Sequence, residues 1–565
     1  MKKNKVSINI ISSFNHANFI SLLKNSKTYN WIINEAEYNQ VFQILNNPKD
    51  KIWKNKTDIS LVWTTPESVS SEFKKLLSRK SINIKKIKDE VISYCSYLKK
   101  IKKNSNIIII PTWVLKEPIE NNVALAYSKR QGLEYNLSLM NHYLFEELAN
   151  DKNFYILNSS KWISKCSITK AYSSKLWYLM KCPFSNNLFN EAISDIVNLH
   201  DSIKGLTKKL LVLDLDNTLW GGIVGEVGWK KLRIGGHDYI GEAFYDFQTK
   251  IKALKDQGII LALASKNEEV TAIEAINNHP EMILSMNDFT THRINWEDKA
   301  KNISEMAAEL NLGLQSVVFF DDSSFERERV KAVLPEVLVP DLPKDPTEYS
   351  NFITKLHCFD SSFITEEDRL RSDLYKSEFK RTELKNKHKS LSGWIDTLNL
   401  EILIENITNK NYPRALQLIN KTNQMNLSTR RLTEKEFNNW VSKKNNYMWT
   451  MRAKDKFGDY GIIGILSITI KNKAANIVDF ILSCRIVGRF IEDSAIQFLK
   501  DFAKKNKIKQ INGLYKKTKK NILIYKFLQR LNIINTKSNS FVISSKKEKI
   551  KIPNIKIIQP KFKSK

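Results

Sequence analysis

The stretch KLLVLDLDNT, residues 209–218, ends an apolar run with two aspartates, Asp214 and Asp216. A short apolar run between helical patterns is typical of a strand buried inside a parallel sheet. Ligands bind at the carboxyl ends of such strands, and side chains at i and i+2 of an extended chain point the same way. We therefore expect two carboxylates to face a ligand at the edge of an α/β domain.

Three further segments add polar groups to the same edge. IILALAS ends at Ser265, whose hydroxyl can hold a phosphate oxygen, and Lys266 follows as a second phosphate-binding candidate. NWEDK supplies Lys299, a cation for both the phosphate and a carboxylate. SVVFFDD ends in the pair Asp321 and Asp322, which are candidate metal ligands. Acidic pairs usually lie on solvated faces, but four such elements in order, three of them on apolar strands, favour a site.

The order of these groups predicts phosphoryl transfer. Asp214 is the expected nucleophile and Asp216 the acid–base partner. A carboxylate that approaches a phosphate dianion needs a cation, and Mg²⁺ held by oxygen ligands meets that need. We expect Asp214, Asp322 and the backbone carbonyl of Asp216 to bind Mg²⁺, with Asp321 close by.

The 565 residues predict several domains. The segments 1–200, 205–345 and 396–547 each alternate strand and helix patterns, whereas 346–395 is a charged helical connector and 548–565 a basic tail. The formal net charge is +30, and lysine is spread along the whole chain, which favours solvated faces over a nucleic-acid site. An acidic protein partner would still be attracted to such a field.

Targeting and redox features are few. The start MKKNKVSINIISSF lacks the long apolar stretch of a signal peptide, and no apolar run is long enough for a membrane span. The five cysteines are widely separated, so neither a disulfide framework nor a zinc site is predicted. These features favour a cytoplasmic protein, and a non-enzymatic nucleic-acid binder is the least favoured class because no such motif is present.

Several motifs together resemble one family. These are DLDNTLWGGIVGEVG, ASKNEE, NWEDKAKNI, FFDDSSFERERV, LQLINKTNQMNLSTRR, FGDYGIIG and FILSCRIVGRF. They are similar to the FkbH-like proteins, subfamily IIIC of the haloacid dehalogenase (HAD) superfamily. The resemblance covers about residues 200–530 and, more loosely, the N-terminal segment. The family usually has Asn-Pro where this chain has Ser323-Ser324, in a loop.

The resemblance implies a specific reaction. FkbH-like enzymes take a glyceryl group from 1,3-bisphosphoglycerate, remove phosphate and load the glyceryl unit on an acyl carrier protein as a thioester, in polyketide-type or related biosynthesis. Neither the gap from Asp216 to Ser265 nor the gap from Asn267 to Lys299 can hold a large cap domain, so the site is open to a bulky partner. A plain HAD phosphatase, or a modifying enzyme of a surface-polysaccharide or lipid pathway, remains the alternative.

The C-terminal segment resembles a GNAT-like acyltransferase with an α+β fold. Arg485 and Gly488 form an Arg-x-x-Gly start that would hold pyrophosphate on backbone amides, but Phe490 replaces the usual small residue. This disfavours acetyl-CoA and leaves open the phosphopantetheine arm of a carrier. Cys484 is either an acyl-accepting nucleophile, because a helix start favours thiolate, or an inert core residue. Residues 421–424, KTNQ, bind phosphate or pantetheine, or merely cap a turn.

The N-terminal segment resembles an SGNH-hydrolase-like α/β domain without its catalytic motifs. Ser12, Ser13, Asn15 and His16 follow the first expected strand, but such residues are ordinary turn formers. We interpret this segment as a docking or structural domain that is not catalytic. The expected architecture is thus a Rossmann-like HAD domain flanked by an SGNH-like α/β domain and a GNAT-like α+β domain.

Overall fold

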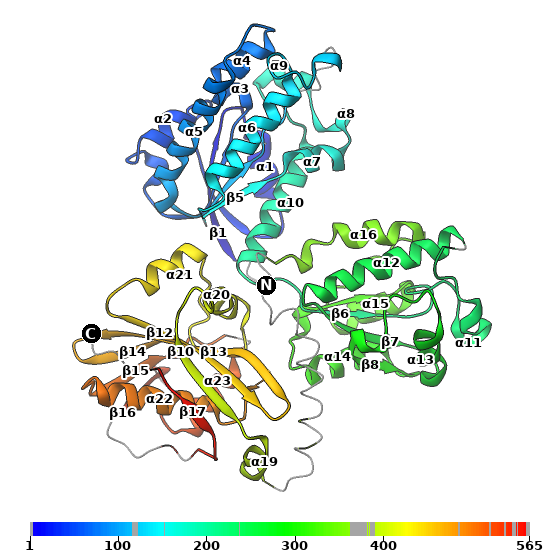
Figure 1. Ribbon diagram of the computed structural model, residues 1–565, viewed down its shortest axis with the longest axis vertical. Coiled ribbons are helices and arrows are strands. Elements are labelled where there is room, and N and C mark those ends of the chain that lie inside the picture. The colour runs from blue at the N-terminus through cyan, green and yellow to red at the C-terminus, as the bar shows by residue number, and fades with distance from the viewer. Residues whose placement is uncertain are drawn as a thin grey trace. The chain divides into compact units, whose positions relative to one another are not determined.

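The structure is a computed structural model (Figure 1). It describes residues 4–115, 123–151, 153–236, 238–361, 381, 384, 390–483, 486–518, 521–535, 538–544, 550 and 552–560. The chain forms two compact units. The first contains residues 1–200 and 433–439, and the second contains residues 201–432 and 440–565. Within the described residues, no helix is both long and apolar enough to cross a membrane.

The first unit is built on a five-stranded parallel sheet in the order β2-β1-β3-β4-β5. The strands are β1 (Lys5–Ser12), β2 (Asn30–Glu35), β3 (Thr57–Trp63), β4 (Ser105–Pro111) and β5 (Phe154–Leu157). Helices α2 (Val41–Asn46), α4 (Ser71–Leu77), α5 (Ile84–Lys100) and α6 (Leu133–Leu148) share one apolar core with this sheet. Other helices of the unit are α1 (Ala17–Asn25), α7 (Ser159–Cys166), α9 (Ser174–Met180) and α10 (Asn186–Ile203, whose last residues belong to the second unit). The alternation of strands and helices confirms the predicted α/β class.

The second unit begins with a four-stranded parallel sheet in the order β8-β7-β6-β9. Its strands are β6 (Leu210–Leu213), β7 (Ile260–Ser265), β8 (Phe289–Ile294) and β9 (Val317–Phe320). Its main helices are α12 (Tyr239–Asp256), α13 (Glu269–Asn278), α14 (Lys299–Glu309), α15 (Ser324–Val333) and α16 (Tyr349–Lys355). The sheet is buried on both faces, since Leu211 and Leu213 join one apolar core and Leu210 and Val212 join the other. This explains why the strands are continuously apolar in sequence.

The core of this domain extends beyond the predicted boundary at residue 345. Tyr349, Ile353 and Phe359 are buried in the core that also contains α12, although they lie in the predicted connector. The many charged residues of the connector favoured the prediction of a solvated helix, although three apolar side chains recur along α16 and the turn after it. Most of the remaining connector, residues 362–380, lies outside the described residues.

The C-terminal part of the second unit is an eight-stranded mixed sheet, in the order β16-β15-β14-β13-β12-β10-β17 with β11 paired to β14. The strands are β10 (Glu401–Asn406), β11 (Met425–Asn426), β12 (Asn446–Asp455), β13 (Gly458–Lys471), β14 (Ala474–Leu482), β15 (Gln510–Leu514), β16 (Ser540–Ser544) and β17 (Lys556–Ile558). The helices are α19 (Leu391–Leu398), α20 (Tyr412–Lys421), α22 (Ile491–Lys505) and α23 (Ile522–Arg530), whereas most of α21 (Glu434–Val441) belongs to the first unit. This is the predicted α+β class.

One strand of this sheet lies in the predicted basic tail. β17 pairs in parallel with β10, and Ile555 and Ile557 pack against the core. Alternating isoleucines among the lysines give this short segment an apolar face, which the overall charge of the tail obscured.

Candidate phosphoryl-transfer site

The predicted site residues meet at the carboxyl edge of the β8-β7-β6-β9 sheet. Asp214 directly follows β6, Ser265 ends β7 and Asp321 directly follows β9. Lys299 is the first residue of α14, and the Asp298 side chain caps the start of that helix by accepting from Lys301 N at 3.1 Å. Because neighbouring parallel strands end at one edge, residues distant in sequence come together there.

Lys299 is the central cation of the site. Its Nζ lies 2.9 Å from Asp214 Oδ1 and 2.6 Å from Asp321 Oδ2, and its side chain is almost completely buried. Burial by itself would lower the pKa of Lys299, but the carboxylates of Asp214 and Asp321 raise it above its ordinary value. Lys299 therefore stays charged and holds Asp214 in place.

Three carboxylates form a candidate metal centre. One oxygen each from Asp214, Asp321 and Asp322 lies within 4.8 Å of the others. Burial, followed by the negative charge of Asp214, raises the pKa of Asp321, whereas Lys299 opposes this shift. Such crowding of like charges in a buried place favours a bound cation, and the purely oxygen donor set fits the predicted Mg²⁺.

The carboxylate of Asp216 lies outside this cluster. Its Oδ1 accepts from Trp220 Nε1 at 2.9 Å and from Val224 N at 3.0 Å. Its Oδ2 accepts from Asn267 Nδ2 at 2.9 Å. Because its carboxylate makes these contacts, Asp216 would bind a metal through its backbone carbonyl and not through its side chain. The acid–base role of Asp216 stays a prediction.

Residues 265–267 form the second side of the site. Ser265 is buried at the end of β7, and its Oγ accepts from Asn267 Nδ2 at 3.1 Å. The Lys266 side chain forms an ion pair with Glu326, with 2.6 Å between Nζ and Oε1, and not with the aspartates of the candidate metal centre. The predicted phosphate contact of Lys266 therefore competes with an existing ion pair.

Two further residues, which the sequence patterns did not indicate as functional, shape the site. Asn267 bridges Asp216 and Ser265, and Arg327 donates through one guanidinium nitrogen to the carbonyls of Asp321 at 2.9 Å and Asp322 at 2.7 Å. Asn267 lies two residues after Ser265, as Asp216 lies two after Asp214, and this spacing was a usable indication. Nothing local indicated Arg327, since it lies within a charged helix.

Large apolar side chains are exposed near the mouth of the site. Val270, Trp296 and Phe325 follow β7, β8 and β9, and they are 74%, 75% and 74% exposed. The described residues between β6 and α12 form the short α11 (Val224–Val227) and one 3₁₀ turn, and they include no cap domain.

In the predicted pyrophosphate loop of the C-terminal domain, one backbone amide already forms a hydrogen bond within the chain. Cys484 and Arg485 lie outside the described residues. Gly488 adopts φ +83° and its N–H donates to Glu492 Oε1 at 2.9 Å. Burial raises the pKa of Glu492. The predicted phosphate contact of the Gly488 amide therefore competes with an existing hydrogen bond to a side chain of the same chain.

The N-terminal unit is filled with aromatic rings where its sheet would bind a ligand. Phe14 follows β1 and Trp63 ends β3, and their ring centroids are 5.4 Å apart. Phe184 contacts both rings at 5.4 and 5.5 Å. Next to Phe14 in the chain, Asn15 accepts from Ala17 N as a turn former, whereas Ser13 accepts from Thr65 N and so joins two loops distant in sequence. The non-catalytic role of this unit stays a prediction.

Comparisons with known proteins agree with this arrangement. Residues 14–199 match the family described as FkbH, N-terminal domain. The N-terminal part of the protein BF1531 from Bacteroides fragilis, which contains a phosphatase domain, is 29% identical over 64% of this chain and 96% of that one, with a TM-score of 0.58. Over these parts the chain is similar to FkbH-like HAD proteins.

Other solved structures resemble smaller parts of the FkbH-like chain. A domain from Methanocaldococcus jannaschii is 16% identical over 25% of this chain and 96% of that one, with a TM-score of 0.21. A GNAT-family acetyltransferase from Staphylococcus aureus Mu50 is 11% identical over 26% of this chain and 99% of that one, with a TM-score of 0.20. No curated protein sequence matches the FkbH-like chain significantly.

Proposed function

We propose that the FkbH-like chain is a Mg²⁺-dependent HAD enzyme that dephosphorylates a phosphoglyceryl donor and loads the glyceryl unit on an acyl carrier protein. The observation that carries the phosphoryl-transfer part is the position of Asp214. Its carboxylate lies 2.9 Å from Lys299 Nζ and within the cluster that Asp321 and Asp322 complete. Lys299, together with a metal ion held by this cluster, would offset the repulsion between the attacking carboxylate and a phosphate dianion.

The residues of the site can carry both halves of the reaction. Asp214 attacks phosphorus, and the bond to the leaving oxygen breaks while Asp216 donates a proton to that oxygen. Asp216 then takes a proton from the water that hydrolyses the aspartyl phosphate, which restores the Asp214 carboxylate and the protonated Asp216. Ser265 and Lys299 hold phosphate oxygens throughout. Asn267 fixes the orientation of Asp216 through the 2.9 Å hydrogen bond.

Mg²⁺ has support from the donor set and from one relative. The phosphatase domain of BF1531 was solved in complex with Mg. Here the carboxylates of Asp214 and Asp322 and the carbonyl of Asp216 would hold the ion, with Asp321 beside it. When bound, the ion neutralises charge on the phosphate and on the attacking carboxylate.

The open mouth supports a carrier-borne acceptor. Without a cap, the phosphoryl-transfer site is open to the end of a long flexible arm, and the net charge of +30 suits an acidic carrier. In the loading step, the Cys484 thiol attacks the acyl carbon of 1,3-bisphosphoglycerate and displaces its acyl phosphate, and the carrier thiol then takes the glyceryl group from the Cys484 thioester and releases the Cys484 thiol. Hydrolysis at Asp214 removes the other phosphate.

The test is intact mass spectrometry of candidate carriers after incubation with the protein, Mg²⁺ and 1,3-bisphosphoglycerate. We expect a glyceryl thioester on the carrier together with phosphate release. Asp214→Asn should reduce removal of the ester phosphate on the order of 10⁴-fold. Asp256→Asn, at an exposed carboxylate on α12, is the matched control. Phosphate release without carrier modification would leave only the plain phosphatase.

A further inference from the structure

Residues 421–427 of the C-terminal domain carry two features in one short segment. The first half, Lys421–Gln424, lines a cavity, and the second half, Met425–Leu427, is built into the sheet. Met425, Asn426 and Leu427 are almost completely buried. The sequence KTNQMNL therefore forms part of the packed structure. Its first half shapes a cavity, and its second half takes up an edge of β14 that a ligand could otherwise use.

The second half closes a gap between two parallel strands. β14 pairs with β15 only from Ala474 to Ile477. Further along the same edge, Met425 lies opposite Leu482 in the β11 pairing. Leu427 N donates to Phe480 O at 3.1 Å, and Lys516 N donates to Leu427 O at 3.2 Å. The segment thus bridges β14 and the chain that follows β15.

This closure argues against an acyl-CoA ligand of the kind a GNAT-like fold implies. An extended ligand could bind between diverging strands by adding to the open edge of β14. Here the protein's own Met425–Leu427 uses that edge, and the Gly488 amide is bonded to Glu492. The described residues therefore do not fit an acyl-CoA lying along β14.

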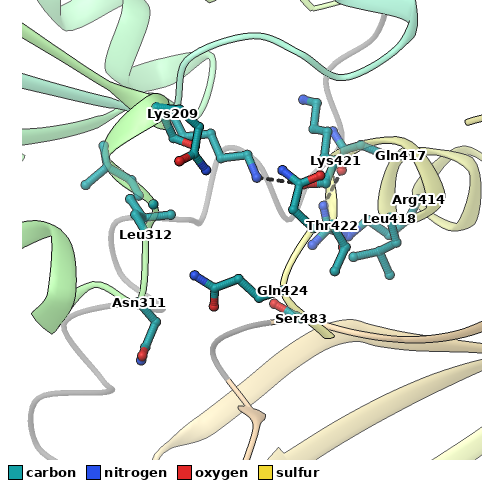
Figure 2. A pocket seen from close by; sticks show the side chains of 15 residues that line it. Lys209, Asn311, Leu312, Arg414, Gln417, Leu418, Lys421, Thr422, Gln424 and Ser483 are labelled. Atoms are coloured by element: carbon teal, nitrogen blue, oxygen red, sulfur yellow. Dashed lines mark hydrogen bonds between the residues drawn. The ribbon is translucent and has the colours of Figure 1, made fainter. Parts of the chain in front are cut away.

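The cavity beside this closure is basic and rich in hydrogen-bonding groups. We call it the amino-edge cavity (Figure 2). It is lined by Lys209, Ile260, Asn311, Leu312, Gly313, Gln315, Ser316, Arg414, Gln417, Leu418, Lys421, Thr422, Asn423, Gln424 and Ser483. None of these described lining residues is acidic, whereas three are basic. A concave site with this lining suits an anion with several oxygen acceptors.

The lining loop is held in place by polar contacts. Lys209 Nζ donates to Lys421 O at 2.8 Å, which joins the two sides of the cavity. Arg431 donates to Thr422 O at 3.2 Å and to the Asn423 side chain. Burial lowers the pKa of Arg431 to about 10. Asn426 Nδ2 also donates to Thr422 O, at 3.0 Å, so the loop is preorganised.

The amino-edge cavity is separate from the phosphoryl-transfer site. Lys209 immediately precedes β6 and Asp214 immediately follows it, so the two residues lie at opposite edges of the sheet. Five residues of extended chain span about 16 Å. Asn311 and Gly313 likewise precede β9, at the edge away from Asp321. An anion in this cavity could not contact the carboxylates around Lys299.

We propose that the amino-edge cavity binds the phosphate group of a phosphopantetheine arm. Lys209 and Lys421 supply positive charge, and Thr422 and Gln424 supply hydrogen bonds. The choice of this arm over other phosphate esters rests on the proposed function, in which a carrier protein is the acceptor. The closed edge of β14 directs such an arm to the cavity and away from the sheet.

The test measures equilibrium binding by isothermal titration calorimetry on the full chain. Asp214→Asn protein in chelator is the parent, so that the probes are not hydrolysed. The probes are 4′-phosphopantetheine, pantetheine and inorganic phosphate. We expect 4′-phosphopantetheine to bind at least about tenfold more tightly than either other probe. Lys209→Met and Lys421→Met should each weaken its binding several-fold and leave pantetheine unaffected.

The matched control is Lys443→Met, which removes a lysine from a different cavity of the same domain. It should bind like the parent, and the thermal midpoint of each variant confirms that it is folded. Equal affinity for inorganic phosphate would assign the cavity to the free ion and overturn the proposal. Unchanged 4′-phosphopantetheine binding in both lysine variants would also overturn it, since the ligand would lie elsewhere. Intact binding without carrier loading would count only against the proposed function.

Discussion

Lys299 and Asp214 form a buried ion pair, with 2.9 Å between Nζ and Oδ1, across the carboxyl edge of the sheet. Lys299 also lies 2.6 Å from Asp321, so one cation compensates two buried carboxylates. The pair thus has two consequences. It stabilises the folded domain in the absence of metal, and it holds the nucleophile where a phosphate can reach it.

Replacement of Lys299 should reveal the first consequence. Lys299→Met leaves two buried carboxylates without their cation, so we expect the free energy of unfolding to fall by about 3–5 kcal/mol in chelator. Urea denaturation followed by circular dichroism measures this. Lys301→Met is the matched control, because the Lys301–Glu297 pair is exposed and should contribute less than about 1 kcal/mol. A similar, small loss in both variants would mean that the ion pair does not stabilise the domain.

Removal of the metal should stop turnover. Chelation should abolish phosphate release, and added Mg²⁺ should restore it, because the carboxylates of the site repel the phosphate without a cation. Asp322→Asn should raise the Mg²⁺ concentration needed for half-maximal rate, whereas Asp256→Asn should not. The measurement is a phosphate-release assay over a range of Mg²⁺ concentrations. Full activity in excess chelator would refute the metal assignment.

Asn267 should act as a positioning residue for Asp216. Asn267→Ala removes the hydrogen bond to Asp216 Oδ2, so we expect kcat for an alkyl phosphate to fall about tenfold. The loss should be smaller for p-nitrophenyl phosphate, whose leaving group needs no proton. Asn278→Ala, at the exposed end of α13, is the control. Equal losses for both substrates would show that Asn267 does not act through proton donation.

Cys484 should carry the acyl group if transfer passes through the protein. We predict a thioester adduct at Cys484 in intact-protein mass spectra after incubation with the acyl donor alone. Cys484→Ala should lose both the adduct and carrier loading but keep phosphate release. Cys166→Ala, at a partly exposed cysteine of the N-terminal unit, is the control. Normal carrier loading by Cys484→Ala would mean that the acyl group passes directly to the carrier thiol.

Much of the site was predictable from local sequence patterns. The buried strands β6, β7 and β9 are apolar along their whole length, and Asp214, Ser265 and Asp321 lie where each run ends. Parallel strands bring such ends to one edge, so the contact of Lys299 with Asp214 followed from the order of the elements. The apolar runs predict the buried strands, and the parallel arrangement of these strands brings the residues that follow them to one edge of the sheet. These two patterns were sufficient to predict the group of site residues.

The remaining features were decided by tertiary contacts between polar groups. Three polar contacts leave no periodic pattern in the sequence: the hydrogen bond from Asn267 to Asp216, the ion pair of Lys266 with Glu326, and the hydrogen bond from Gly488 N to Glu492. Likewise, KTNQMNL is a polar segment by composition, yet its Met425–Leu427 half completes the sheet beside β14. The sequence determined which segments are buried. Only the folded chain decided which donor meets which acceptor, because that depends on strand order, register and side-chain direction.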